Sequence, residues 1–134
     1  MPRPSLVLAL ASVLALLLSC NTSVNPATGR REVVLMTPED EQRIDEQAVR
    51  EISASVGIVT DSELTEYVAE VGETLAVNSP RLDVDYEFQI VEMPEPNAFA
   101  LPGGHIFVSR GLLVLANTEA ELAHVLGHEI GHVA

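Results

Sequence analysis

The residues with the clearest chemical meaning stand near the end of the sequence, where His128 and His132 flank Glu129 in an H-E-x-x-H pattern. On a helix, residues four apart lie one turn apart on the same face, so both imidazoles can reach one metal ion. Zinc prefers histidine nitrogen, and catalytic zinc keeps one position open for water. Glu129 would act there as a general base, taking a proton from the attacking water and passing it to the leaving amine. The pattern predicts zinc-dependent hydrolysis.

Other potential ligands lie close by in the sequence. His124 is about 12 Å along a helix axis from His132, too far to share one ion, so we expect it to line the cleft or support a ligand. Glu121 lies further back on the same face and is poorly placed as a third ligand. His105 stands at a predicted hairpin end, where it is either an ordinary strand residue or a cleft contact. Catalytic zinc needs a third protein ligand, so we expect one beyond this chain and weak zinc binding by the 134 residues alone.

A capped helix is predicted to hold the motif. Thr118 and Glu121 form a capping box in front of it. Apolar residues recur on one side of the following segment, and the three histidines fall nearly opposite them. The apolar positions are Leu122, Leu126, Ile130 and Val133. Such a helix would bury one face and line a cleft with the other.

Two helices are predicted further upstream, and we interpret both as scaffold. The first begins at Thr37 and Pro38, which suit a cap and a first helical position, and ends at Gly57. Its apolar stripe consists of Ile44, Ala48 and Ile52. The second begins near Asp61 and ends before Asn78. Its apolar face consists of Leu64, Tyr67, Val68, Val71 and Leu75.

Between these helices and the motif, the apolar period changes from 3.6 to 2. Residues 84–90 alternate apolar and polar side chains, which predicts a half-buried strand. Residues 98–101 and 105–109 are typical of two short strands around a glycine-rich turn, and residues 110–116 of a short helix. The fold class is therefore α+β, with N-terminal helices, a small β-sheet with an edge strand and a C-terminal helix that carries the motif.

The N-terminal residues have the pattern of an export signal. Residues 1–19 are predicted to be a signal peptide, because residues 6–18 are apolar but for one serine and too few to span a membrane comfortably. Cys20 follows in a context that resembles a bacterial lipobox; the alternative is an ordinary signal peptide with an incidental cysteine. Residues 20–36 would be the lipidated cysteine and a polar, turn-prone tether, and residues 37–134 the folded domain.

Charge and cysteine content exclude some partners. The chain has 20 acidic against 7 basic residues and a net charge of -13. This argues against binding nucleic acid, or an anionic membrane surface, by electrostatics. Cys20 is the single cysteine, so it cannot form an internal disulfide, and lipidation would account for a lone thiol in an exported protein.

Together these motifs resemble the HtpX/Ste24-related zinc metallopeptidases, in the secreted bacterial lipoprotein branch similar to BepA and LoiP. The resemblance rests on the H-E-x-x-H motif, residues 119–123, the run Asn97-Ala98-Phe99-Ala100-Leu101-Pro102-Gly103-Gly104-His105 and residues 25–31. It implies a zincin-like fold of the gluzincin type, in which a Glu from a later helix completes the zinc site. That helix is missing from this sequence, so the resemblance also implies an incomplete domain.

The resemblance further implies that a sheet edge before the motif helix holds substrate as an added strand. The candidate edge is residues 98–101 or residues 105–109, with Asn97, Ala98, Phe99, Ala100 and His105 as contacts. The expected activity is zinc-dependent cleavage of misfolded or misassembled envelope proteins. The expected location is the periplasmic face of the outer membrane, anchored by lipid at Cys20. Two alternatives stay open: an inactive lipoprotein that acts as a binding or chaperone module, and an acidic envelope lipoprotein whose histidines are incidental.

Overall fold

The computed structural model describes residues 22–24, 31–33 and 36–134. The chain divides into two units, with the boundary between Met36 and Thr37. In the first unit, β1 (Thr22–Val24) pairs antiparallel with β2 (Arg31–Val33), so the segment predicted as a tether contains a strand pair. The predicted signal peptide and Cys20 lie outside the described residues. Within the described residues, none of the helices has the length and apolar character needed to span a membrane.

The second unit begins with two helices that start where their caps predict. α2 (Pro38–Ser55) follows Thr37, and α3 (Ser62–Ala76) follows Asp61. In each case the side chain of the cap residue accepts a hydrogen bond from a backbone amide of the first turn. Each bond satisfies an amide that has no partner inside its own helix.

The apolar stripe predicted for α2 is buried only in part: Ala48 and Ile52 are half-buried, and the fully buried side chain of this helix is polar. Ile44 is 41% exposed, whereas Asp45 is 1% exposed. The reason is that α2 packs on the turn that contains Gly103. The Asp45 carboxylate accepts a hydrogen bond from the amide of Gly103. In α3, Val68 is buried as predicted, although Tyr67 on the same predicted face is 40% exposed.

A three-stranded sheet forms the centre of the second unit. Its strands are β3 (Glu87–Val91), β4 (Ala98–Ala100) and β5 (His105–Ser109), in the order β3-β5-β4. The β4–β5 hairpin is antiparallel as predicted, and β3 pairs parallel with β5. The strand predicted from residue 84 begins three residues later, at Glu87. The central strand is therefore β5, and β4 is an edge.

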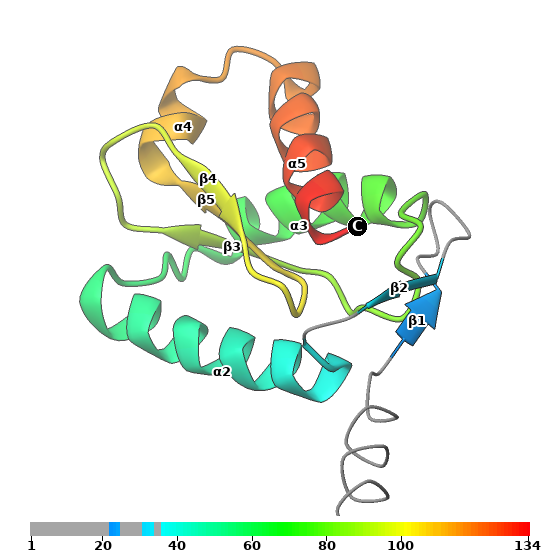
Figure 1. Cartoon of the computed structure of the whole chain (residues 1–134). Coiled ribbons are helices and arrows are strands. Elements are labelled where there is room, and N and C mark those ends of the chain that lie inside the picture. The colour runs from blue at the N-terminus through cyan, green and yellow to red at the C-terminus, as the bar shows by residue number, and fades with distance from the viewer. Residues whose placement is uncertain (1–21, 25–30, 34–35) are drawn as a thin grey trace, which may run out of the picture. The chain divides into compact units, whose positions relative to one another are not determined.

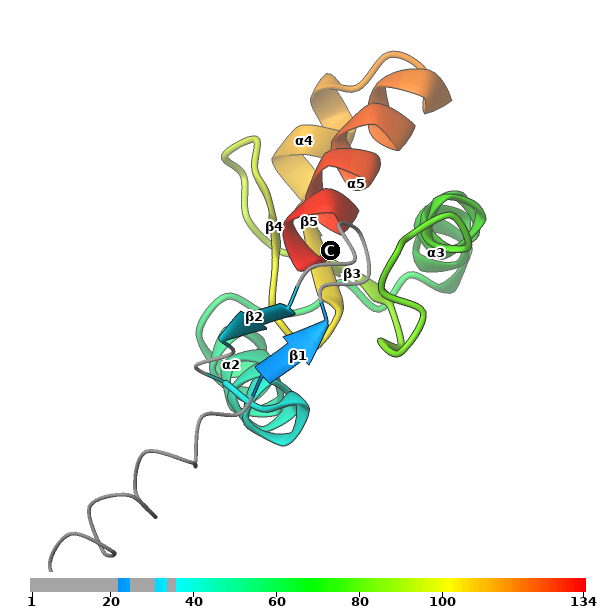
Figure 2. The same ribbon diagram turned by 45° about the vertical axis from the view of Figure 1, so that its right-hand side comes forward.

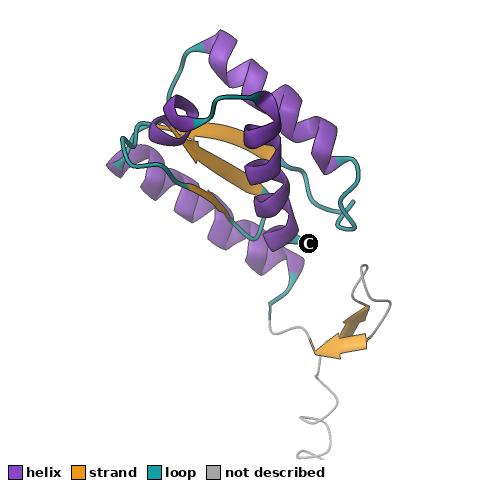
Figure 3. Ribbon diagram, turned by 90° about the horizontal axis from the view of Figure 1, so that it is seen from above, coloured by secondary structure: helices purple, strands orange, loops and turns teal. Residues whose placement is uncertain are grey.

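Two more helices follow the sheet: α4 (Arg110–Leu115) and α5 (Glu119–Val133). α3 and α5 cover one face of the sheet, and α2 runs along the other (Figures 1 and 2). Figure 3 shows the helices in purple around the orange strands. The core lies between the sheet, α3 and α5, and consists of Val59, Val68, Phe88, Ile90, Ile106, Val108, Leu122, Leu126 and Ile130. This packing fixes α5 against the sheet and beside β4.

Candidate metal centre

The helix that carries the H-E-x-x-H motif is capped at its first turn. Thr118 accepts a hydrogen bond from the amide of Glu121 at 3.2 Å, as the capping box predicts. The carboxylate of Glu121 accepts from the amide of Asn117 at 2.7 Å, one residue earlier than in the standard box. Both bonds satisfy amides near the helix start, which favours a fixed beginning for α5.

α5 has the two faces that its periodicity predicts. The apolar positions Leu122, Leu126, Ile130 and Val133 are all buried. The histidines at positions 124, 128 and 132 are exposed. Glu129 lies at the border between the two faces and is 8% exposed. A carboxylate in this position is shielded from bulk water on one side and stands beside the exposed histidine pair on the other.

His128 and His132 point their ring nitrogens at each other. Their Nε2 atoms lie 3.0 Å apart, and the rings meet edge to face with centroids 4.6 Å apart. Together with Glu129 they form the one group of three or more potential ligands that could hold a metal ion in the described part of the chain. Their ligand atoms all lie within 4.8 Å of one another.

This geometry fits a zinc ion. Two nitrogens at about 2.0–2.1 Å from a tetrahedral zinc lie about 3.4 Å apart, so the observed pair needs to open by only a few tenths of an ångström. The donor set also fits, because imidazole nitrogen is a preferred zinc ligand. Both rings are exposed, so small ring rotations meet little resistance from packing. The residues present can hold two of the four positions of such an ion.

The other predicted histidines lie outside this cluster. His124 is exposed on α5 and is not part of the group of potential ligands. Glu121 is engaged with Asn117 at the helix start. His105 lies between α2 and β3, where Nδ1 contacts Asp45 and Nε2 lies 3.1 Å from Glu87. Of the two roles considered for His105, the structure therefore supports the strand residue and not the cleft contact.

The outer edge of β4 is the sheet edge nearest to the motif. β5 pairs on both sides, so the alternative that residues 105–109 form the substrate edge is wrong. The backbone of Asn97, which precedes β4, forms hydrogen bonds with Ser109 of β5. In the described residues, β4 pairs with β5 alone, and α5 lies alongside it. An extended segment could therefore pair with residues 98–100 close to His132.

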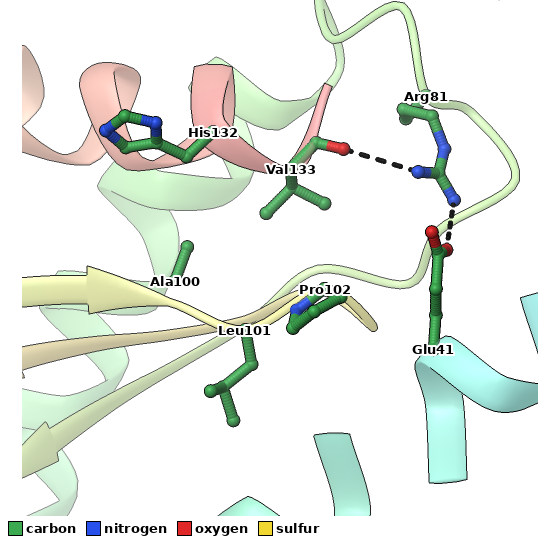
Figure 4. A pocket seen from close by; sticks show the side chains of 7 residues that line it. All are labelled: Glu41, Arg81, Ala100, Leu101, Pro102, His132 and Val133. Carbon is green, nitrogen blue, oxygen red and sulfur yellow. Dashed lines mark hydrogen bonds and ion pairs between the residues drawn. The ribbon is translucent and has the colours of Figure 1, made fainter. Parts of the chain in front are cut away.

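A pocket of about 170 Å³ lies between the end of β4 and the last turn of α5. Figure 4 shows its lining, which consists of Glu41, Arg81, Ala100, Leu101, Pro102, His132 and Val133. Sequence reasoning missed Glu41 and Arg81, because they are ordinary charged residues on a helix and in a loop and form no local motif. One wall of the pocket thus comes from the edge strand and another from the motif helix.

Arg81 joins three segments at this pocket. It donates to the carbonyl of Val133 at 3.3 Å and to the carboxylate of Glu41 at 3.0 Å, and it also pairs with Asp83. The Asp83 hydrogen bond is the main cause of a raised pKa of Arg81, which burial partly opposes. The same bond lowers the pKa of Asp83. Arg81 therefore stays charged and ties the last turn of α5 to α2.

Comparison with known proteins places these residues in a family. Residues 62–134 match the model of peptidase family M48. The chain is similar to a Beta-barrel assembly-enhancing protease of Yersinia pestis, with 32% identity over 108 residues, or 81% of this chain and 22% of that protein. It is also similar to the Mitochondrial metalloendopeptidase OMA1 of Schizosaccharomyces pombe, with 33% identity over 110 residues, or 80% of this chain and 33% of that protein. The chain thus spans about a fifth to a third of the length of these relatives.

Proposed function

The chain belongs to peptidase family M48, and we propose that it carries the metal-binding part of a zinc-dependent endopeptidase. The proposal rests mainly on one observation: the Nε2 atoms of His128 and His132 face each other at 3.0 Å, with Glu129 beside them. Residues 37–134 would form this part of a zincin-like domain. The names of the relatives, a protease and a metalloendopeptidase, support the same reaction class.

In the proposed mechanism, His128 and His132 would hold a zinc ion through Nε2. When bound, the ion supplies Lewis-acid activation of a water molecule and of the scissile carbonyl. Glu129 accepts the proton of the attacking water on its carboxylate and delivers it to the leaving amine. Its position suits this role, because an 8% exposed carboxylate next to the histidine pair is shielded from bulk solvent.

The open edge of β4 would bind the substrate. A peptide in extended conformation pairs with the backbone of residues 98–100, which gives affinity with modest sequence selectivity. The pocket between Ala100 and His132 would take a substrate side chain next to the scissile bond. Edge binding of this kind requires an unfolded or locally opened protein, because the substrate must present a free strand.

The biological setting follows from the N-terminal sequence and from the relatives. We propose that the protein is exported and attached by lipid at Cys20 to the periplasmic face of the outer membrane. Its substrates would be misfolded or misassembled envelope proteins. The support consists of the lipobox-like sequence around Cys20 and of the name Beta-barrel assembly-enhancing protease given to a relative.

The replacement Glu129→Gln tests the proposed reaction. It keeps the size of the side chain and removes the base, so we expect cleavage of an unfolded protein substrate to fall by about 100-fold to 10,000-fold. Zinc content should not change, because both imidazoles remain. The measurement is the rate of cleavage by the protein purified from its own cells, with zinc content determined on the same samples.

The isosteric replacement Glu121→Gln is a matched control on the same helix. Its amide oxygen can still accept from Asn117, so cleavage should stay near the wild-type rate. If Glu129→Gln cleaves as fast as the control, the peptidase proposal is wrong. A binding or chaperone role through the β4 edge would then take its place.

A further inference from the structure

Asp45 is a buried charge that the proposed mechanism does not use. It lies on α2, on the opposite face of the sheet from α5, and is 1% exposed. Its Oδ1 accepts a hydrogen bond from the amide of Gly103 at 2.9 Å and lies 3.5 Å from the amide of His105. A carboxylate buried to this degree is costly unless it is paired and hydrogen-bonded. Its partners are Gly103 of the β4–β5 turn and His105, the first residue of β5.

The turn is shaped to receive this carboxylate. A Cβ atom at Gly103 would lie 2.6–2.9 Å from the side-chain atoms of Asp45, so only glycine leaves room for it. The next residue, Gly104, has φ = 111°, a backbone conformation that L side chains rarely adopt. The two glycines therefore allow close approach of α2 and a tight reversal of the chain, and Asp45 fills the space that they leave.

His105 completes the contact from the other side of the turn. Its buried Nδ1 contacts Asp45 Oδ2, and its Nε2 lies 3.1 Å from Glu87 Oε2 on β3. The imidazole thus lies between two carboxylates, and it joins α2 to the first residues of β5 and β3.

The first residue of this turn and the two residues before it form a wall of the pocket next to His132. They are Ala100, Leu101 and Pro102. Glu41 lies one helical turn before Asp45 on α2 and reaches the opposite wall, because it binds Arg81, which in turn donates to Val133 of α5. One face of α2 therefore contacts both sides of the gap between the edge strand and the motif helix.

We propose that Asp45 is a positioning residue: by holding the Pro102–Gly104 turn, it sets the end of edge strand β4 and hence the pocket in which substrate lies beside His132. The inference rests on the proposed function, since it concerns how the same site receives its substrate. Asp45 itself contacts neither the proposed metal site nor the open edge of β4. Its effect should therefore appear in substrate binding and not in the chemical step.

The test compares Asp45→Ala, which removes both contacts, with Asp45→Asn, which keeps an oxygen for the Gly103 amide and loses the ion pair. The control is Glu46→Gln, which neutralises the neighbouring acid on α2, whose side chain is 56% exposed. Two quantities are measured on the whole protein: KM and kcat for a quenched fluorogenic peptide, and amide hydrogen exchange of residues 98–105. The exchange measurement does not depend on catalysis.

We expect Asp45→Ala to raise KM by about tenfold or more while kcat stays within about twofold, because a displaced wall weakens binding of the substrate equally in the ground state and in the transition state. Exchange in residues 98–105 should become faster, while α5 keeps its protection. Asp45→Asn should recover part of both effects, and Glu46→Gln should resemble the wild type. A KM and an exchange rate that stay at wild-type values in a folded Asp45→Asn and Asp45→Ala would overturn the inference.

The two proposals fail in different ways. If Asp45→Ala unfolds the protein, Asp45→Asn alone decides, through the same two measurements. If the whole protein cleaves no peptide, the proposed function fails, and the exchange of residues 98–105 still shows whether Asp45 holds the turn. If cleavage is normal and only the KM effect is missing, the positioning role is wrong and the peptidase proposal stands.

Discussion

Histidine occurs in two contrasting environments in this protein. On α5, His128 and His132 are exposed, and their Nε2 atoms face each other at 3.0 Å. On the other face of the sheet, His105 is enclosed, with a carboxylate at each ring nitrogen. The first arrangement leaves nitrogen lone pairs available to an ion, and the second places a carboxylate against each nitrogen. The surroundings of the ring, and not the residue type, separate a potential metal ligand from a structural contact.

The contrast also separates stability from metal binding. His128 and His132 form an open pair, which lowers the free energy of unfolding little because exposed imidazoles remain hydrated. Asp45, His105 and Glu87 form a closed contact. It joins three segments, α2, β3 and the β4–β5 turn, and the Asp45 carboxylate in it is buried. We therefore expect changes at the open pair to affect metal binding and activity with little effect on folding, and changes at the closed contact to affect stability and the β4–β5 turn with little effect on metal binding.

The largest effect is expected from His132→Ala at the open pair. Loss of a residue that only supports a zinc ligand already costs about 10-fold to 100-fold in affinity or activity. Loss of a ligand itself should cost more, so zinc affinity and cleavage should both fall by over about 100-fold. Unfolding by urea in the presence of a chelator should be unchanged, because the side chain is exposed. A His132→Ala variant that binds zinc as tightly as the wild type would remove the distinction between the two environments.

An intermediate effect is expected from His105→Ala at the closed contact. The change leaves the Asp45 carboxylate buried without its ion-pair partner, which should lower the free energy of unfolding by about 2–4 kcal/mol. Zinc affinity of the folded protein should stay within about twofold, since His105 lies outside the metal cluster. Urea denaturation followed by circular dichroism measures the first quantity, and competition with a zinc-binding dye measures the second. Equal loss of zinc affinity in His105→Ala and His132→Ala would contradict the account.

The smallest effect is expected at the Arg81–Asp83 pair, in how the free energy of unfolding changes with pH. The hydrogen bond from Arg81 lowers the pKa of Asp83 below its ordinary value of 3.8. A carboxylate with a lowered folded-state pKa adds stability above its unfolded-state pKa and loses it as the pH falls through the folded value. In Asp83→Asn, the free energy of unfolding should therefore fall less steeply below about pH 4 than in the wild type.

The effect should be small because the Asp83 side chain is 60% exposed and its charge is thus screened by solvent. Thermal melting between pH 2.5 and pH 5 measures it, with Asp85→Asn as a control for the loss of one acid nearby. The same pH slope for Asp83→Asn and the wild type would mean that the Arg81–Asp83 pair does not act in solution.

The elements of the motif region could be predicted because their signals are local. The cap at Thr118 and the apolar spacing of α5 act within one or two turns, and the structure has both where the sequence places them. The β4–β5 hairpin also follows from a local glycine-rich turn. The parallel pairing of β3 with β5 could not be predicted in the same way, because it joins segments separated by another strand.

The closed contact of Asp45 with His105 could not be predicted from the sequence. Asp45 is one of several acids on α2, and nothing in its neighbours shows that it alone is buried. Its partners, Gly103 and His105, come about 60 residues later. Gly103 and Gly104 indicate a turn in the sequence. That Gly103 also leaves space for the Asp45 carboxylate depends on how α2 packs against the sheet, which has no local signal in the sequence.

A zinc K-edge X-ray absorption spectrum of the protein purified from its own cells tests most directly whether His128 and His132 bind zinc. We expect about one zinc per molecule, with imidazole nitrogens at about 2.0–2.1 Å in its coordination shell. We also expect a weaker imidazole signal in His132→Ala than in the wild type. A protein without zinc, or zinc held with no imidazole ligand, would contradict the assignment of His128 and His132.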